Sequence, residues 1–190
     1  MNVFVLNTGR CGSTTLIAAC RHMTNFSAAH ESRAACLGDD RFAFPKQHIE
    51  ADNRLSWVLG RLDRAYGDEA YYVHLSRDPE ATAASFARRY RGGVMRAYRK
   101  GILFEHAAGK DPLDVCRDYC DTVNTNITHF LRDKSHTMTF QLESAKEDFA
   151  RFWKWIGAEG DLDGGMAEWD RKHNASVGKL RKMTGKIFKS

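Results

Sequence analysis

The segment "VFVLNTGRCGSTTL", residues 3–16, predicts a strand, a loop and a helix in immediate succession. Its first four residues are all apolar, which is typical of a strand buried on both faces of a parallel sheet. Apolar residues then return at helical spacing, at Leu16, Ala19, Cys20 and Met23. Because ligands of open parallel sheets bind beyond the carboxyl ends of the strands, the intervening loop is the first candidate binding site.

Three further segments have the pattern of strands. A short segment at residues 26–29 leads to His30 and Glu31, and residues 71–76 form another. In "HTMTFQLES", residues 136–144, apolar side chains alternate with polar ones, which predicts a strand with one better-buried face.

Helical spacing marks most of the segments between these strands. The strongest pattern, that of a long amphipathic helix, places apolar residues at Val115, Tyr119, Val123, Ile127 and Phe130. A second helical face is expected from Ala51, Leu55, Val58, Leu59 and Leu62. Pro79 suits the first turn of a helix over residues 80–90, and Gly157 ends a helix over residues 149–156.

Strands that alternate with helices predict an α/β fold, here a three-layer sandwich with a central, mainly parallel sheet. The chain has 190 residues, of which 43% are hydrophobic, so it is long enough to bury a core as one domain over residues 1–190. Residues 92–110 begin with two glycines and have no clean period, and we expect a loop or lid there.

The composition is that of an ordinary globular protein, and its net charge of +5 favours anionic partners in general. The five cysteines form no CxxC pair, which predicts free thiols in a reducing compartment. No apolar segment approaches the roughly 20 residues that span a bilayer, so we expect a cytoplasmic protein. Basic residues gather in two blocks, residues 88–100 and 171–189, and a solvated surface is the simpler interpretation of each.

The first loop contains the residue types that bind a tetrahedral anion. Gly9 and Gly12 allow sharp turns and a close approach of the backbone, and the helix that follows adds amide groups and partial positive charge. Hydroxyl donors follow at Ser13, Thr14 and Thr15. Arg10 is the only full charge, and it stands in for the lysine of the GxxxxGK[ST] motif, which this loop lacks.

A second anion-binding pair is expected in "SRDPEATAAS", residues 76–85. Arg77 follows a predicted strand, and Ser85 lies eight residues later in the next helix. The two could hold one tetrahedral anion between a charged fork and a hydroxyl group. In the simpler interpretation, Arg77 pairs with Asp78 and Ser85 is an ordinary surface residue.

In this order, "GRCGSTTL" and the pair of Arg77 and Ser85 resemble the two nucleotide-binding motifs of sulfotransferases. The resemblance implies a fold like that of P-loop nucleotide hydrolases, with 3′-phosphoadenosine 5′-phosphosulfate (PAPS) as donor and adenosine 3′,5′-bisphosphate (PAP) as product. It implies that Arg77 and Ser85 bind the 3′-phosphate. It also implies that the phosphosulfate is bound by the loop residues Gly9, Arg10, Cys11, Gly12, Ser13, Thr14 and Thr15.

One residue departs from the pattern of the small-molecule enzymes in this family. Thr15 stands where many of them have a tryptophan against the adenine. The chain therefore looks closer to small bacterial or carbohydrate-type members. "FQLES", residues 140–144, is similar to the family's strand with a trailing glutamate. A distorted form of its C-terminal motif is found at Gly178, Arg181, Lys182, Gly185 and Lys186.

The resemblance also implies a reaction, the transfer of a sulfonyl group to an acceptor hydroxyl or amine without a metal. Arg10 and the loop amides would stabilise the leaving phosphate. His30 and Glu31 follow the second strand at the same edge of the sheet, and we expect one of them, Glu31 before His30, to be the general base. In the simpler interpretation neither residue has a functional role: His30 is a strand-end histidine bonded to the backbone, and Glu31 is a surface glutamate.

Several alternatives remain open at the level of the sequence. The acceptor could be a sugar, a small molecule, a lipid or a peptide. A small-molecule or nucleoside kinase with a degenerate P-loop is the alternative enzyme, although Ser76 and Arg77 follow the strand where a carboxylate would be expected. A basic nucleic-acid-binding module could use the block at residues 88–100, and a non-catalytic nucleotide-binding protein would have the same motifs. We regard nucleic acid as the less favoured partner.

Overall fold

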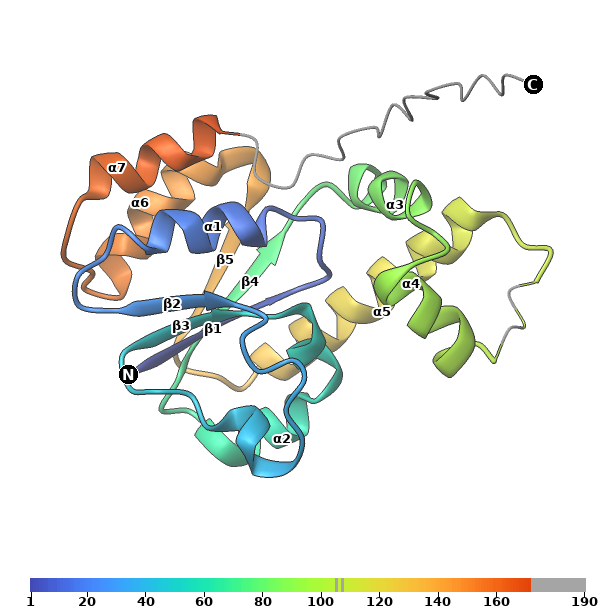
Figure 1. Cartoon of the computed structure of the whole chain (residues 1–190), viewed down its shortest axis with the longest axis horizontal. Helices are drawn as coiled ribbons and strands as arrows, with labels where there is room; N and C mark the ends of the chain where they lie inside the picture. Colours follow the sequence, from blue (N-terminus) through green and yellow to red (C-terminus); the bar gives the residue numbers. More distant parts are fainter. Residues whose placement is uncertain (105, 107, 172–190) are drawn as a thin grey trace, which may run out of the picture.

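The computed structural model describes residues 1–104, 106 and 108–171 and shows an α/β fold around a five-stranded sheet (Figure 1). All strand pairs are parallel, and the strand order is β2-β3-β1-β4-β5. The strands are β1 (Asn2–Asn7), β2 (Ser27–His30), β3 (His48–Ala51), β4 (Tyr71–Ser76) and β5 (Thr137–Gln141). The expected α/β class and its central parallel sheet are confirmed.

Helices flank this sheet on both faces (Figure 1). They are α1 (Ser13–Cys20), α2 (Leu59–Tyr66), α3 (Pro79–Ala87), α4 (Gly93–Ala97), α5 (Pro112–Leu131), α6 (Ala145–Trp155) and α7 (Leu162–Ala167). Short 3-10 turns lie at Gly38–Phe42, Asn53–Trp57, Leu142–Ser144 and Glu168–Asp170, and a π-helical turn spans Tyr98–Ile102.

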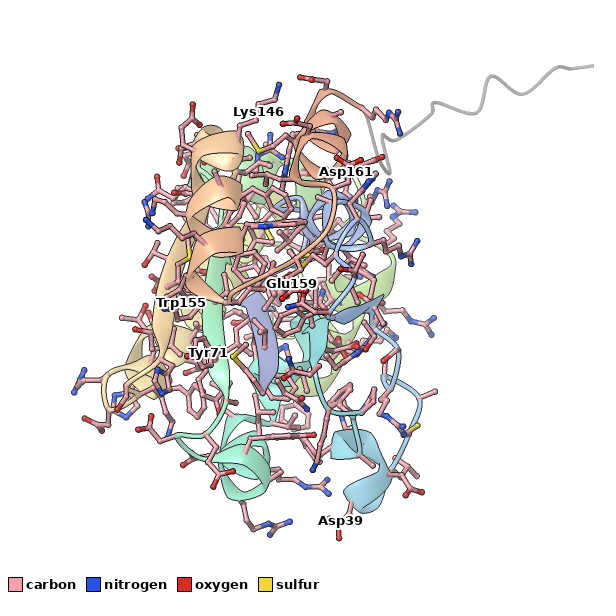
Figure 2. The ribbon with its side chains drawn as sticks, turned by 90° about the vertical axis from the view of Figure 1, so that its left-hand side faces the viewer. Asp39, Tyr71, Lys146, Trp155, Glu159 and Asp161 are labelled. Atoms are coloured by element: carbon pink, nitrogen blue, oxygen red, sulfur yellow. The ribbon has the colours of Figure 1, made fainter. Side chains whose placement is uncertain are left out.

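Strand β1 divides the interior into two cores because its side chains alternate between the two faces of the sheet. Val3 and Val5 pack in the core beneath α1 and α6, whereas Phe4 and Leu6 pack in the core beneath α2, α3 and α5. All four are fully buried, and each such side chain stabilises the fold by about 1.5–3 kcal/mol relative to exposure. Figure 2 shows one edge of the first core, where Trp155 of α6 lies 4.7 Å from Tyr71 of β4 between ring centroids.

The long amphipathic helix expected around residues 115–130 is confirmed as α5. Asp111 caps its N-terminus through the amide of Leu113, and Pro112 occupies the first turn. Near the middle of the helix, the buried hydroxyl of Tyr119 donates a hydrogen bond of 2.7 Å to the carbonyl of Thr8. Helix α5 is thereby tied to the start of the loop that follows β1.

The predicted helical face that begins at Ala51 is wrong at its start. Ala51 ends β3, and helix α2 begins only at Leu59. This strand was missed because two of its four residues are polar yet almost fully buried. His48 and Glu50 bond each other at 3.1 Å, and Glu50 also accepts two 2.7 Å hydrogen bonds from the amide and hydroxyl of Ser32. Because their hydrogen bonds are satisfied, these polar residues can be buried in a strand that lacks an apolar sequence pattern.

The loop or lid expected over residues 92–110 is also only partly correct. Helix α4 and the π-helical turn occupy the first half of this segment. Met95 and Tyr98 are buried against the second core, three residues apart, and so fix one helical face. The hydroxyl of Tyr98 donates to Asp118 of α5 at 2.5 Å. The first half of the segment is therefore a packed element and not an irregular loop.

The other boundaries differ by a few residues. The strand expected at residues 26–29 is β2, Ser27–His30, and the helix expected over residues 80–90 is α3, Pro79–Ala87. Helix α7 lies beyond Gly157, where no element was expected. The C-terminal motif from Gly178 to Lys186 lies outside the described residues.

A variant of β3 tests whether its buried polar pair stabilises the strand. Glu50→Ala leaves His48 and Ser32 without their carboxylate partner, so we expect a loss of about 2–4 kcal/mol in the free energy of unfolding. Urea titration followed by circular dichroism measures this loss. The exposed Glu69→Ala is the control, expected within about 0.5 kcal/mol of wild type. Equal stability of the two variants would contradict the assignment.

Candidate functional site

The loop after β1 bends sharply because three of its residues are left-handed. The φ angles of Gly9, Arg10 and Gly12 are 85°, 63° and 91°. The side chain of Asn7 supports the turn by accepting a 2.8 Å hydrogen bond from the amide of Gly9. A Cβ on Gly12 would lie 2.7 Å from Leu142 Cδ1, so the loop also packs closely against the chain after β5. Glycine is thus required here both for backbone angle and for space.

Helix α1 presents its N-terminus to this loop. Its N-cap residue is Gly12, which has no side chain to cap the helix. The first amide groups of a helix lack partners within the helix, and the dipole makes this end partially positive. Ser13, Thr14 and Thr15 begin the helix, and all three line the same cleft as the loop. This arrangement can bind an anion.

Cys11 differs from the other expected loop residues. Its side chain is fully buried, with Sγ 3.6 Å from Asn7 Oδ1, and it is not among the described residues that line the cleft. Burial raises the pKa of its thiol to about 12, so the thiol stays protonated at neutral pH. Cys11 can contribute to the site only through its backbone.

The second expected pair lies beside the loop. Arg77 follows β4, and Ser85 lies in α3, whose N-terminus is capped by Asp78 through a 2.7 Å bond from Ala81 N. Arg10 Nε donates to Ser85 Oγ at 3.1 Å, and Arg77 Nη1 donates to the carbonyl of Arg10 at 3.4 Å. The two motifs, 67 residues apart between Arg10 and Arg77, are therefore in direct contact.

Positive charge converges on Arg10. Its pKa is lowered from the ordinary value, first by burial and then by the charges of Arg89, Arg77 and Arg88. Like charges held this close repel one another, and a bound anion would relieve that repulsion.

His30 and Glu31 lie at the same edge of the sheet, as expected. His30 Nε2 is 3.0 Å from the hydroxyl oxygen of Ser13, so the imidazole contacts the start of α1 directly. Glu31 has a left-handed backbone, with φ of 54°, and its carboxylate accepts a 2.8 Å hydrogen bond from Arg54. Arg54 also lies 3.4 Å from Asp52, a carboxyl group whose pKa is raised chiefly by burial.

The loop, the start of α1 and the residues that follow β2 and β4 line one large cleft, with a volume of about 2470 Å³. Every expected site residue except Cys11 contributes to it. Sequence patterns did not identify Arg54 or Trp57, which line the cleft from the segment after β3, or Trp169 near the end of the described chain. A polar segment directly after β3 would have indicated the first two, had β3 been recognised.

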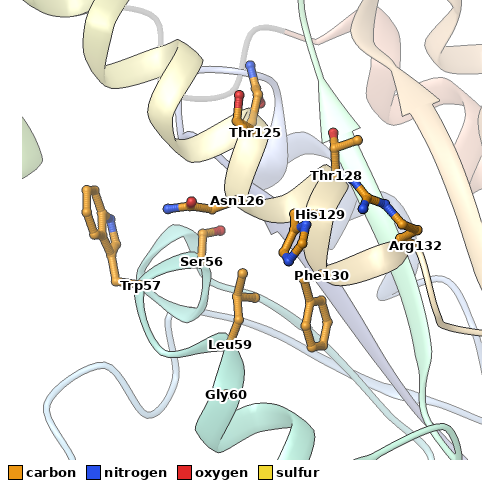
Figure 3. Close-up of a pocket in the computed structure, with 11 residues that line it drawn as sticks. Ser56, Trp57, Leu59, Gly60, Thr125, Asn126, Thr128, His129, Phe130 and Arg132 are labelled. Carbon is orange, nitrogen blue, oxygen red and sulfur yellow. The ribbon is translucent and has the colours of Figure 1, made fainter.

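A second, smaller cavity of about 750 Å³ lies between α5 and the segment from Ser56 to Gly60 (Figure 3). Figure 3 shows Asn126, His129 and Phe130 of α5 beside this segment. Trp57 lines both cavities, but none of the expected site residues lines the smaller one.

Comparison with models of known protein families gave no match, and comparison with curated proteins gave none either. Among the described residues, no group of three or more histidine, cysteine, aspartate or glutamate side chains is placed to hold a metal ion. The described helices include none with the length and apolar character needed to cross a membrane.

A substitution in the loop tests its geometry. Gly12→Ala must hold a left-handed backbone and displace Leu142, so we expect it to lower the free energy of unfolding by about 2 kcal/mol. Gly60→Ala is the matched control, because its Cβ meets nothing within 4 Å and it lies in helix α2. That change should be neutral or stabilise by up to about 1 kcal/mol. Thermal unfolding of the pair compares them, and a stable Gly12→Ala would argue against the loop geometry.

Proposed function

We propose that this protein is a PAPS-dependent sulfotransferase with a fold of the P-loop nucleotide-hydrolase type. The observation that carries the proposal is the meeting of two anion-binding groups in one cleft. One is the left-handed loop with the N-terminus of α1, and the other is Arg77 with Ser85. A nucleotide with phosphates on both its 3′ and 5′ positions has two separate anions of this kind.

The chemistry we propose is in-line transfer of a sulfonyl group. The amides of the loop and α1 bind the 5′-phosphosulfate, and Arg10 stabilises the charge that develops on the leaving phosphate oxygen. The hydrogen bond to Ser85 holds the Arg10 guanidinium in place before the substrate arrives. Positioning of this kind is the main source of rate enhancement in transfers that need little covalent chemistry from the protein.

The two candidate bases have different neighbours in the cleft. His30 contacts Ser13 at the start of α1, where the sulfonyl group would lie, and a neutral imidazole can accept the acceptor's proton. The carboxylate of Glu31 is already engaged by Arg54, at 2.8 Å. We therefore propose His30 as the general base and Glu31 as a residue that positions Arg54 in the cleft.

A kinase remains the alternative enzyme, and one observation bears on it. Asp52 follows β3, the strand next to β1, where a magnesium-binding carboxylate could lie. Its Oδ1, however, accepts a 2.8 Å hydrogen bond from the amide of Arg54 and thereby caps the turn at Asn53–Trp57. The loop also lacks the lysine that a triphosphate requires.

Calorimetry with PAP and AMP tests the two anion groups separately, because these nucleotides differ only in the 3′-phosphate. Arg77→Ala should weaken PAP binding by about 10- to 100-fold and AMP binding distinctly less, since a charged hydrogen bond to the 3′-phosphate contributes about 1.5–3 kcal/mol. Arg10→Ala should weaken both nucleotides. Arg21→Ala, an exposed substitution at the other end of α1, is the control and should change neither affinity.

Two outcomes would contradict the proposal. If Arg10→Ala and Arg77→Ala both bind PAP as tightly as the wild-type protein does, the assignment of these residues to the site is wrong. Stabilisation of the wild-type protein by ATP with magnesium, but not by PAP, would favour the kinase instead.

The choice of base is tested by the slow transfer of the sulfonyl group from PAPS to water, which needs no identified acceptor. His30→Asn should reduce PAP release by about 10²- to 10⁴-fold, with PAP affinity unchanged, because it removes the proton acceptor. Glu31→Gln should have a smaller effect, under about tenfold. The reverse order of the two variants would assign the base to Glu31.

A further inference from the structure

The cleft is large enough for more than the nucleotide. Ligand pockets usually have volumes of about 300–1,000 Å³, whereas this cleft measures about 2470 Å³. One wall is formed by α1 and the loop after β1, and another by the end of α3, α4 and the π-helical turn. If the proposed function holds, on which this inference rests, the second wall is available to the acceptor.

This second wall is strongly basic. The described residues that line the whole cleft include eight arginines and one acidic residue, Glu31. They include no lysine and no aspartate. The donor carries only about four negative charges, on its 3′-phosphate and its phosphosulfate. Arg54 and Arg171 have partners in Glu31 and Glu168. Arg89 also has an interaction partner. The other five arginines of the cleft still carry more positive charge than the donor alone neutralises.

Arg99 is the best-defined of the remaining cations. Its guanidinium lies 4.2 Å from the ring centroid of Tyr90, which fixes the plane of the side chain. Its Nε is buried and has no hydrogen-bond partner among the described residues. Arg99 also lines the cleft, where a nearby anion would offset part of the cost of this unpaired donor electrostatically.

The element that carries Arg99 is held rigidly. Tyr98 is buried, packs against Tyr119 of α5 at 5.3 Å between ring centroids, and donates to Asp118. Arg91, exposed one residue after Tyr90, lines the same wall. Arginines on a rigid support bind carboxylate, sulfate and phosphate groups well because their planar forks match two oxygens at once.

We propose that the acceptor is itself an anion, a hydroxyl compound that carries a carboxylate or a sulfate or phosphate ester. Its acid group binds Arg91 and Arg99, and its hydroxyl lies at His30. In the transfer, a bond forms between the hydroxyl oxygen and the sulfur as the bond from sulfur to the bridging phosphate oxygen breaks. His30 takes the hydroxyl proton, and PAP leaves with the electron pair of the broken bond.

The test is calorimetry on the PAP-loaded protein with three matched sugars. They are p-nitrophenyl glucoside, p-nitrophenyl glucuronide, which adds a carboxylate, and p-nitrophenyl glucoside 6-phosphate, which adds a phosphate ester. We expect at least one acid sugar to bind 10-fold or more tightly than the neutral one. This preference should fall as salt concentration rises. Comparing the two acid sugars shows which anion is preferred.

The double variant Arg91→Gln and Arg99→Gln should reduce the preference for the acid sugar to under about threefold and leave PAP affinity within twofold of wild type. Arg96→Gln is the matched control, because Arg96 is an exposed arginine of α4 that is not among the described residues lining the cleft. It should leave the preference intact.

The outcomes separate the two proposals. If PAP does not bind the wild-type protein, the proposed function fails and this inference fails with it. If PAP binds but neither acid sugar binds more tightly than the neutral one, or the double variant keeps the preference, only the anionic acceptor is overturned. Displacement of the acid sugar by a short single-stranded RNA, lost in the same double variant, would overturn it in favour of a nucleic-acid partner.

Discussion

The parallel alignment of every strand with β1 is the constraint on which the site depends. β1 is buried along its whole length and pairs with β3 on one side and β4 on the other. Because all strands run in one direction, their carboxyl ends lie along one edge of the sheet, and the residues that follow them meet there. Thr8, Glu31, Asp52 and Arg77 each come directly after a different strand. An antiparallel strand would have moved its residue to the opposite edge. Hydrophobic burial of the strands therefore brings together polar groups that are far apart in the sequence.

Burial of the strands alone does not fix the shape of the loop after β1, whose backbone is unfavourable by itself. A left-handed arginine costs about 1 kcal/mol or more, and such strain persists only where the surroundings impose it. Here the surroundings are the side-chain bond to Ser85, the bond from Arg77 to the backbone of Arg10, and Tyr119 at the carbonyl of Thr8. These contacts come from the residue that follows β4, from α3 and from α5, so three separate parts of the chain must be in place before the loop takes its shape.

The parts of this architecture that sequence predicts well are those whose signal is local. The apolar run of β1, the alternation of β5 and the long period of α5 each reflect burial of a contiguous segment, and all three were predicted. Strand β3 was missed because His48 and Glu50 are buried through hydrogen bonds to each other and to Ser32, a tertiary feature that no local pattern reveals. Arg54 and Trp57 were missed for the same reason, since their place in the cleft follows from β3. The sharp loop after β1 was predicted because its glycines and hydroxyl residues lie close together in the sequence.

The arginines of the cleft show how stability and binding oppose each other in this chain. Burial and neighbouring positive charges both lower the pKa of Arg10, so the cleft holds cations in unfavourable proximity. The two apolar cores provide the stability that makes this arrangement possible, because they lie on either side of the sheet and do not include the cleft's charged residues. An anion that binds only the folded chain relieves the repulsion and shifts the folding equilibrium toward the native state. The same charges that oppose folding are therefore the charges that would favour a bound anion, so stability and the proposed binding depend on one set of arginines.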